Sequence, residues 1–387
     1  MINPEYLFLE KKIISKVDRF KLSKADNLEL KKNFHNSVIL ISGAAGSIGS
    51  SFVKKIRVYN FKELILLDKD ENELTELNRE LVLIAKNKVK KIKFICSDLN
   101  LINIQKFLLN NKVSHYLNFA AIKHVRSQEQ LESIKYMFLT NSINFLPFSG
   151  KQKFINLKQL FSVSTDKTVY PSSILGVTKF LMEQKLAHFK LNNNKIHTSS
   201  ARFANVSFSN GSILKSIADR INSKKIFGIP ENVKRYFITH EESTSICFKA
   251  LLKRNDGHIL IPNEKILRKS FFIKFLCNQI LKIKGYQPLY SNKIKKINKN
   301  KFPVVLNKLL THGQKKHEKF YDDTDVLIND KSDKSYLKIN LKYKINPNKI
   351  VSNVIRFANI KKIINFLKKN IKNFKDNKKT IYLSRNI

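Results

Sequence analysis

The chain alternates short apolar runs with segments of helical periodicity over its first two thirds. Seven runs have the length and apolar character of buried strands, at residues 37–43, 63–68, 91–98, 114–121, 160–166, 195–206 and 258–263. Segments 47–59, 71–86 and 174–190 between them repeat their apolar residues with a helical period. Strands and helices in such alternation predict a parallel sheet with helices on both faces. We therefore expect an α/β fold of the Rossmann type, a doubly wound parallel sheet with a smaller C-terminal lobe.

The same pattern divides the chain into four parts. We place them at residues 1–36, 37–206, 207–330 and 331–387. The first part contains one or two polar helices, the second holds the βα alternation, and the third is a looser region with a last sheet strand near 258–262. The fourth is rich in Lys and Asn, so we expect a basic tail, with amphipathic helix over 345–374 and a frayed last dozen residues.

Composition adds a large positive charge to this picture. The 387 residues include 73 Lys and Arg against 30 Asp and Glu, a formal net charge of +43. The lysines are spread along the chain with abundant Asn, Ile and Phe, which is typical of a genome rich in A and T. A site for a polyanion needs its charge gathered on one face. We therefore expect no nucleic-acid partner.

Other features of composition concern location. No run of about 18 apolar residues occurs, so we expect no membrane span. The N-terminal segment lacks the apolar stretch of a secretory signal. The three cysteines are an odd number without metal-type spacing, which fits a reducing cytoplasm and predicts neither disulfides nor a metal site. We expect a cytoplasmic protein.

A glycine motif follows the first predicted strand and opens the first predicted helix. Gly43, Gly46 and Gly49 have the spacing GxxGxxG. Gly43 permits a tight turn, Gly46 lets the backbone approach a pyrophosphate, and Gly49 lets helix and sheet pack closely. The backbone amides at the helix start, including Ser47 and Ile48, attract phosphate groups. The segment therefore predicts a dinucleotide-binding site.

Acidic residues end the next two predicted strands. Asp68 stands nineteen residues after Gly49 and is placed to bond ribose hydroxyls. Asp68 would repel the 2′-phosphate of NADP, whereas Lys69 would attract it, so we expect NAD(P) with NAD slightly favoured. Asp98, followed by Leu99, is placed to meet the adenine. Asp98 is alternatively a helix cap.

Chemically active side chains follow the fifth predicted strand. Thr165, Asp166 and Lys167 end it, and Lys179 stands thirteen residues after Asp166. Strand ends of an open α/β sheet face the ligand, so these groups would gather there. The alternative is that Thr165 and Asp166 cap a helix while Lys167 is solvated.

At these residues the chain resembles a known family. The matching segments are GAAGSIGS (43–50), AAIKHVRS (120–127), STDKTVYP (164–171), GVTK (176–179), ARFANVSFSNGS (201–212) and KRYFIT (234–239). In this order, over roughly residues 37–330, they are similar to nucleotide-sugar 4,6-dehydratases, the polysaccharide biosynthesis branch of the extended short-chain dehydrogenase/reductase family. GYQP (285–288) and EKFYDD (318–323) look closest to the subgroup that feeds legionaminic-type, nonulosonic acid sugar synthesis.

The resemblance implies an activity and a set of roles. The substrate would be UDP- or GDP-N-acetylglucosamine, and the protein would be a homo-oligomer. Thr165 would bond the C4 hydroxyl of the sugar, Lys167 would remove the C5 proton, and Asp166 would help the C6 hydroxyl leave. Lys179 would bind the nicotinamide ribose. The other positions implied are Ala120, Ala121 and Lys123 at the cofactor, and Lys123, His124, Asn205 and Arg235 at the substrate, the last two holding its diphosphate.

One departure from the family pattern concerns the proton acceptor. The superfamily uses Tyr-x-x-x-Lys, and Leu175 stands at the Tyr position. Thr165, Asp166, Lys179 or an ordered water must then take the C4 proton, because Tyr170 is five residues off register. We expect Leu175→Tyr to be tolerated. A lysine acts as a base near pH 7 only if its pKa is lowered, and we expect Lys123 and Lys179 to lower that of Lys167.

Two other functions remain open at this point. A nucleotide-sugar 4-epimerase or reductase would share the fold and the cofactor, but it needs no acid–base pair for elimination, so Asp166 and Lys167 argue against it. A non-catalytic dinucleotide-binding protein is favoured by Leu175 and by the charge. The retained Thr165-Asp166-Lys167 segment and Lys179 oppose that interpretation.

Overall fold

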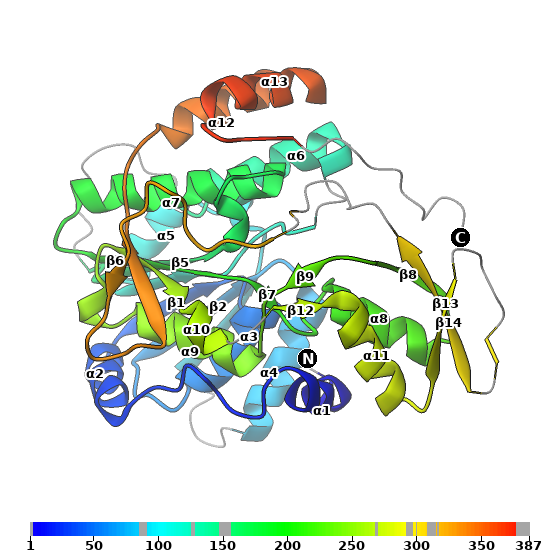
Figure 1. The fold of residues 1–387 in the computed structure, drawn as a ribbon. Coiled ribbons are helices and arrows are strands. Elements are labelled where there is room, and N and C mark those ends of the chain that lie inside the picture. Colours follow the sequence, from blue (N-terminus) through cyan, green and yellow to red (C-terminus); the bar gives the residue numbers. More distant parts are fainter. Residues whose placement is uncertain are drawn as a thin grey trace.

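Figure 1 shows the fold in a computed structural model, which describes residues 3–84, 91–124, 128–146, 156–267, 270–291, 297–298, 300–307, 315 and 317–376. Within these residues a nine-stranded sheet has the order β15-β16-β11-β6-β5-β4-β1-β2-β3. Its strands are β1 (Val38–Ser42), β2 (Glu63–Asp68), β3 (Ile92–Cys96), β4 (His115–Asn118), β5 (Gln159–Thr165), β6 (His197–Phe203), β11 (His258–Pro262), β15 (Ile328–Asn329) and β16 (Tyr336–Asn340). Neighbours from β3 to β11 pair in parallel, and β16 is antiparallel to both β11 and β15. All seven predicted strands lie in this sheet, which confirms the Rossmann-type fold class.

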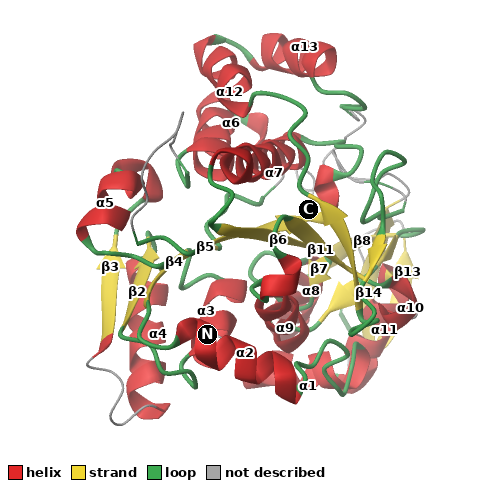
Figure 2. Cartoon of the chain, turned by 90° about the vertical axis from the view of Figure 1, so that its left-hand side faces the viewer, coloured by secondary structure: helices red, strands yellow, loops and turns green. Residues whose placement is uncertain are grey.

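Helices cover both faces of the sheet. Figure 2 shows α5 (Ile104–Asn110), α6 (Leu131–Phe138) and α7 (Ile174–Asn192) above it, and α3 (Ser47–Ile56), α4 (Glu71–Ile84) and α9 (His240–Ala250) below it. Because both faces are covered, the central strands are apolar on both sides, and every residue of β1 is buried. The strand order reverses between β1 and β4, which places the ends of these two strands at the switch point where α/β sheets bind ligands.

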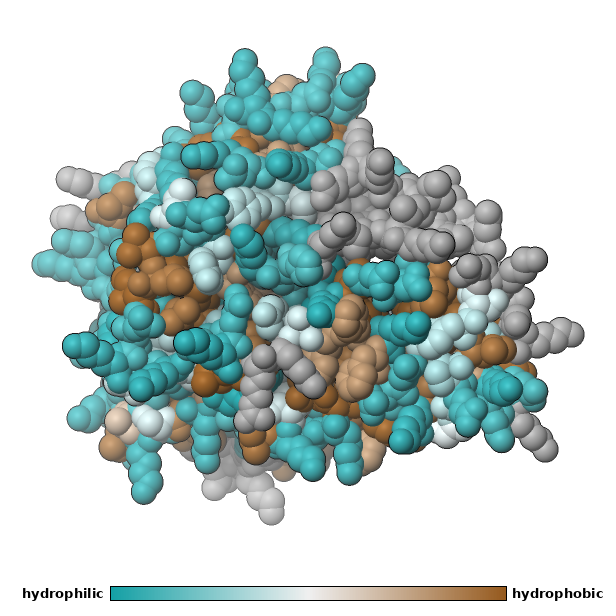
Figure 3. Space-filling model, viewed as in Figure 1, coloured by the Kyte–Doolittle hydropathy of each residue, from teal (hydrophilic) through white to brown (hydrophobic). Residues whose placement is uncertain are grey.

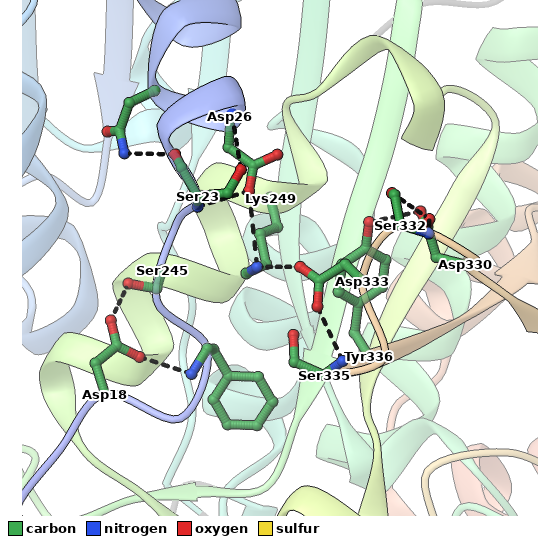
Figure 4. Close-up of polar contacts among 12 residues, drawn as sticks. Asp18, Ser23, Asp26, Ser245, Lys249, Asp330, Ser332, Asp333, Ser335 and Tyr336 are labelled. Carbon is green, nitrogen blue, oxygen red and sulfur yellow. Dashed lines mark hydrogen bonds and ion pairs between the residues drawn. The ribbon is translucent and has the colours of Figure 1, made fainter.

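The N-terminal part forms two helices, α1 (Pro4–Ile13) and α2 (Lys24–Phe34). Ser23 and Asp26 form a capping box that starts α2. Figure 4 shows how this part is tied to the sheet: Lys249 of α9, almost fully buried, forms ion pairs with Asp26 and with Asp333, just before β16. Lys249 of α9 therefore links α2 to the segment just before β16.

A smaller lobe follows the parallel sheet. It contains α8 (Ile213–Asn222), α11 (Ile273–Ile283) and a three-stranded sheet of β8 (Phe227–Pro230), β14 (Lys301–Asn307) and β13 (Gln287–Ser291). Two short pairs join this lobe to the main sheet: β7 (Asn205–Val206) with β10 (Phe237–Ile238), and β9 (Lys234–Arg235) with β12 (Phe271–Phe272). The short helix α10 (Glu264–Leu267) follows β11. The lobe has its own apolar core.

The C-terminal part contributes to the body of the protein. Residue 331, where we expected a basic tail to begin, lies between β15 and β16 of the main sheet, so this boundary does not coincide with a break in the fold. The amphipathic segment forms α12 (Pro347–Arg356) and α13 (Ile360–Asn370), which bury their apolar faces against α6 and α7. The expected frayed end lies almost wholly outside the described residues.

The surface in Figure 3 is hydrophilic over most of the face shown, with apolar side chains in scattered patches. In the part of the chain that the structure describes, no helix has both the length and the apolar character needed to span a membrane.

Candidate active site

The glycine loop joins β1 to α3 through two close backbone contacts. Gly43 has φ +70°, and a Cβ there would lie 2.4 Å from the backbone nitrogen of Ala120. A Cβ on Gly49 would lie 2.1 Å from the carbonyl oxygen of Gly43. Both glycines are therefore required by the packing of the loop itself.

Gly46 differs from the other two glycines. It is the N-cap of α3, with extended backbone angles of φ −63° and ψ 164°, and no side chain caps this helix. A Cβ on Gly46 would approach the carbonyl oxygen of Gly43 no closer than 3.4 Å, an ordinary contact. Among the described residues, therefore, none fills the space beside Gly46, and no side chain caps the first amides of α3, at Ser47 and Ile48. This arrangement fits the pyrophosphate of a dinucleotide.

The acidic residues after β2 and β3 hold the loops beside this site. Asp68 accepts hydrogen bonds from the backbone nitrogens of Ala45 (2.9 Å) and Asp70 (3.1 Å). Asp98 caps the short 3₁₀ helix η2 (Leu99–Leu101), so the alternative role for this residue is present. It also accepts a hydrogen bond from Tyr136. Burial raises the pKa of Asp98, but the bonds from Tyr136 and Asn100 outweigh it and lower the pKa overall.

The neighbours of these two acids bear on the choice of cofactor. The ammonium of Lys69 lies 5.1 Å from the centre of the Tyr136 ring and 3.4 Å from its hydroxyl oxygen, so it is directed toward Tyr136. Leu99 is buried in the apolar core, at 5 % exposure.

Thr165, Asp166 and Lys167 lie together at the carboxyl end of β5. The Thr165 hydroxyl donates to Asp166 Oδ1 at 2.9 Å, and Lys167 Nζ donates to the same oxygen at 3.2 Å. Asp166 and Lys167 are also the first two residues of the 3₁₀ helix η5 (Asp166–Thr168), and Thr165 is its N-cap. The Asp166 side chain is 2 % exposed and that of Lys167 34 %, so the carboxylate is enclosed while the lysine side chain is partly exposed.

The lysines of the site differ in the direction in which the protein shifts their pKa values. Burial lowers the pKa of Lys167, but the carboxylates of Asp166 and Glu318 outweigh it and raise the pKa above its ordinary value. The expectation that neighbouring cations lower the pKa of Lys167 is therefore wrong, because the two carboxylates dominate. Lys179 is buried, donates to the carbonyl of Val163 at 3.0 Å, and has its pKa lowered to about 8 by burial, against an opposing effect of Glu183. Lys123 is exposed, yet the protein around its ammonium and the charge of Lys167 lower its pKa to about 8.

The two residues expected to hold the diphosphate meet at a residue that the sequence reasoning did not select. Asn205 Nδ2 donates to Glu318 Oε1 at 2.7 Å, and Arg235 Nε lies 3.3 Å from the same oxygen. The backbone nitrogen of Tyr236 donates to Glu318 Oε2 at 2.8 Å. Glu318 begins the EKFYDD segment, which was noted for resemblance alone; no spacing in the sequence links it to Asn205 or Arg235.

The segment after β4 holds further residues that the sequence predicts at the site. Ala120 packs against Gly43, and its backbone nitrogen donates to Asn118 Oδ1 at 3.2 Å. Ala121 follows it, partly buried. His124 lies so close to Gly211 that a Cβ on that glycine would be 1.9 Å from the imidazole. The structure therefore places the segment after β4 beside the loop that follows β7.

Leu175, which stands at the position of the superfamily tyrosine, lies in an apolar environment. It is 4 % exposed and belongs to the apolar cluster between α6, α7, α12 and α13. The Tyr170 hydroxyl accepts a hydrogen bond from the backbone nitrogen of Asp323 at 3.1 Å. The expectation that a tyrosine at Leu175 is tolerated is therefore revised, because the position is filled by packing.

A doubly wound sheet with an open glycine loop at its switch point defines an α/β protein of the Rossmann type. Residues 39–340 match the polysaccharide biosynthesis protein family, and the chain belongs to this family.

Individual proteins are similar to this chain at low identity, and the two solved structures below share its fold. The chain is 26 % identical over 326 residues to the capsular polysaccharide biosynthesis protein CapD of Staphylococcus aureus, covering 81 % of this chain and 53 % of CapD, so it spans about half the length of that relative. The structure of Pen from Bacillus thuringiensis is similar with a TM-score of 0.62 at 18 % identity, covering 79 % of this chain and 87 % of Pen. The UDP-N-acetylglucosamine 4-epimerase of Methanobrevibacter ruminantium M1, in complex with UDP-N-acetylmuramic acid, has a TM-score of 0.53 at 16 % identity, covering 83 % of this chain and 96 % of the epimerase.

Proposed function

We propose that this chain is a nucleotide-sugar 4,6-dehydratase, which converts UDP- or GDP-N-acetylglucosamine to a 4-keto-6-deoxy sugar for surface polysaccharide or nonulosonic acid synthesis. The observation that supports it most is the grouping of the Thr165 hydroxyl, the Asp166 carboxylate and the Lys167 ammonium around one oxygen atom. Elimination of water needs an acid and a base close together, and these residues provide both.

The open side of Gly46 and the uncapped start of α3 would hold the pyrophosphate of a dinucleotide, with Asp68 toward its ribose. Asp68 and the direction of Lys69 toward Tyr136 favour NAD over NADP. The bound nicotinamide would supply the reversible hydride transfer of the reaction. Lys179, buried beneath the end of β5, would bind the nicotinamide ribose.

The contact between Thr165 and Asp166 offers a route for the C4 proton in the absence of a tyrosine. As C4 is oxidised, the C4 hydroxyl gives its proton to Thr165 Oγ1, which passes its own proton to Asp166 Oδ1. The carboxylate thereby becomes a neutral acid, ready to protonate the C6 hydroxyl when it leaves as water. In the net reaction, the C4 hydroxyl loses one proton and the departing water molecule gains one.

The same proton transfer prepares Lys167 to act as the base. The Asp166 carboxylate is one of the two that raise the pKa of Lys167. Once Asp166 is neutral and the sugar covers the partly exposed Lys167 side chain, burial favours the neutral amine, and the proton leaves to solvent. The amine then removes the C5 proton, made acidic by the C4 ketone, and later returns a proton to C5.

A nucleotide-sugar 4-epimerase is the second candidate. The observation in its favour is the likeness to the epimerase of Methanobrevibacter ruminantium, which shares most of its length with this fold. The two reactions differ in mass balance, because epimerisation retains all atoms and dehydration loses one water.

The test is to incubate the purified protein with UDP- and GDP-N-acetylglucosamine and measure the products by mass spectrometry. Loss of one water from either sugar nucleotide is the expected result. A product of unchanged mass with inverted C4 would replace this proposal with the epimerase.

A further inference from the structure

Glu318 occupies the place between the two residues to which we assign the substrate diphosphate. Its side chain is 4 % exposed, and both carboxylate oxygens accept hydrogen bonds, Oε1 from Asn205 and Oε2 from the Tyr236 backbone. Arg235, whose side chain is 10 % exposed, lies with its Nε 3.3 Å from Oε1. The cation and the amide that would bind an anionic ligand are therefore already directed at an anion of the protein itself.

We propose that Glu318 is a resident anion that must take up a proton when the substrate diphosphate binds to Arg235 and Asn205. The inference rests on the proposed function, because it takes the ligand of these two residues to be a diphosphate. A diphosphate and a carboxylate cannot share one guanidinium and one amide at low dielectric without strong repulsion. Protonated, Glu318 becomes a hydrogen-bond donor, and a buried carboxylic acid is a good partner for a phosphate oxygen.

The surroundings of Glu318 already favour its neutral form. Burial and the charge of Asp166 raise its pKa to about 7, against the opposing effects of Lys167, Arg235 and the Tyr236 backbone bond. The bound diphosphate adds negative charge and draws Arg235 away, and both changes raise the pKa further. Among the described residues, the charged or titratable groups that interact with Glu318 include Asp166 and Lys167 of η5, Arg235 of β9, Tyr236 after it, and Lys315 of its own segment.

The uptake has a consequence for Lys167. The carboxylates of Asp166 and Glu318 together raise the pKa of this lysine. Substrate binding would neutralise Glu318, and the oxidation at C4 would neutralise Asp166. Glu318 would therefore act in two ways, by donating to the bound diphosphate and by removing one of the two charges that keep Lys167 protonated.

The experiment measures UDP binding to the full chain by titration calorimetry, with GDP in parallel, in buffers of different ionisation enthalpy between pH 7 and 9. Wild type should take up about half to one proton per bound nucleotide at pH 8, so its affinity should fall up to about tenfold per pH unit. Glu318→Gln should lose this uptake and bind UDP at least about tenfold more tightly at pH 8. UDP's own titration is common to both proteins, so the difference between them isolates Glu318.

Two further variants separate this effect from a change in folding. Glu318→Asp keeps a carboxylate and should keep the proton uptake. Glu264→Gln removes an exposed carboxylate that lies 3.4 Å from the Tyr236 hydroxyl, and it should behave as wild type. UDP binding with equal proton uptake in wild type and Glu318→Gln would overturn the inference while leaving the dehydratase proposal standing. If neither nucleotide binds and no water is lost in the product assay, the proposed function fails, and the inference with it.

Discussion

The space beside Gly46 allows a substitution that should remove the dinucleotide without harming the fold. The backbone of Gly46 is extended, and a Cβ there meets a single atom at 3.4 Å. Gly46→Val should therefore cost no more than about 1 kcal/mol of folding free energy, as an unfavourable N-cap residue. The valine would stand where the pyrophosphate must approach the first amides of α3. Losing two hydrogen bonds from these amides to the charged pyrophosphate costs about 3–6 kcal/mol, which weakens dinucleotide binding by about 10²- to 10⁴-fold.

The measurement is the dinucleotide released when purified protein is denatured, together with cofactor titration and a urea unfolding curve. Wild type should retain NAD(P), because the hydride must return to the same sugar, and Gly46→Val should fold but retain none. Gly49→Ala is the matched control: its Cβ would collide with the Gly43 carbonyl at 2.1 Å, so it should destabilise the fold by about 1–3 kcal/mol or more. Equal dinucleotide in wild type and Gly46→Val would refute the assignment of this loop.

Four further predictions concern packing and charge. Leu175→Tyr adds a ring and a hydroxyl to a filled apolar cluster and should lower the free energy of unfolding by about 1–3 kcal/mol, measured in urea; an unchanged midpoint would contradict the packing argument. Lys249→Met leaves Asp333 without its cation, while Asp26 keeps Arg254, and should cost about 3 kcal/mol, whereas the exposed neighbour Lys253→Met should cost almost nothing. The fold lowers the pKa of Asp330, so its contribution is present at neutral pH and should be lost on acidification below about pH 4, as denaturation curves at several pH values will show. DNA binding in a salt titration should be weak, independent of sequence and steeply lost with salt; tight, selective binding at physiological salt would contradict the charge argument.

The sheet could be predicted from the sequence because its strands are buried on both faces. Such strands read as continuous apolar runs, and β1 and β2 stand out for this reason. β16 (Tyr336–Asn340) was not predicted, because polar side chains interrupt its short apolar pattern. Its partner β11 is also far away along the chain. A pairing between segments so far apart leaves no local signal.

The grouping of candidate residues could be predicted where they follow one another along one strand or loop. Thr165, Asp166 and Lys167 are consecutive, so the end of β5 brings them together directly. Glu318 was not found, because its partners Asn205 and Arg235 come from two separate short strands. The packing around Leu175 could not be predicted from the sequence, because α12 and α13, which share its apolar cluster, lie in the part expected to be a basic tail.

The most direct test of the account is turnover in heavy water by wild type and by Lys167→Met. Wild type should convert UDP- or GDP-N-acetylglucosamine to a product that has lost one water and carries deuterium at C5, because the amine of Lys167 exchanges with solvent before it returns a proton. Lys167→Met should bind cofactor but form little product and incorporate little deuterium. Normal turnover by Lys167→Met would show that the base is misassigned, and wild-type turnover without loss of water would contradict the dehydratase function itself.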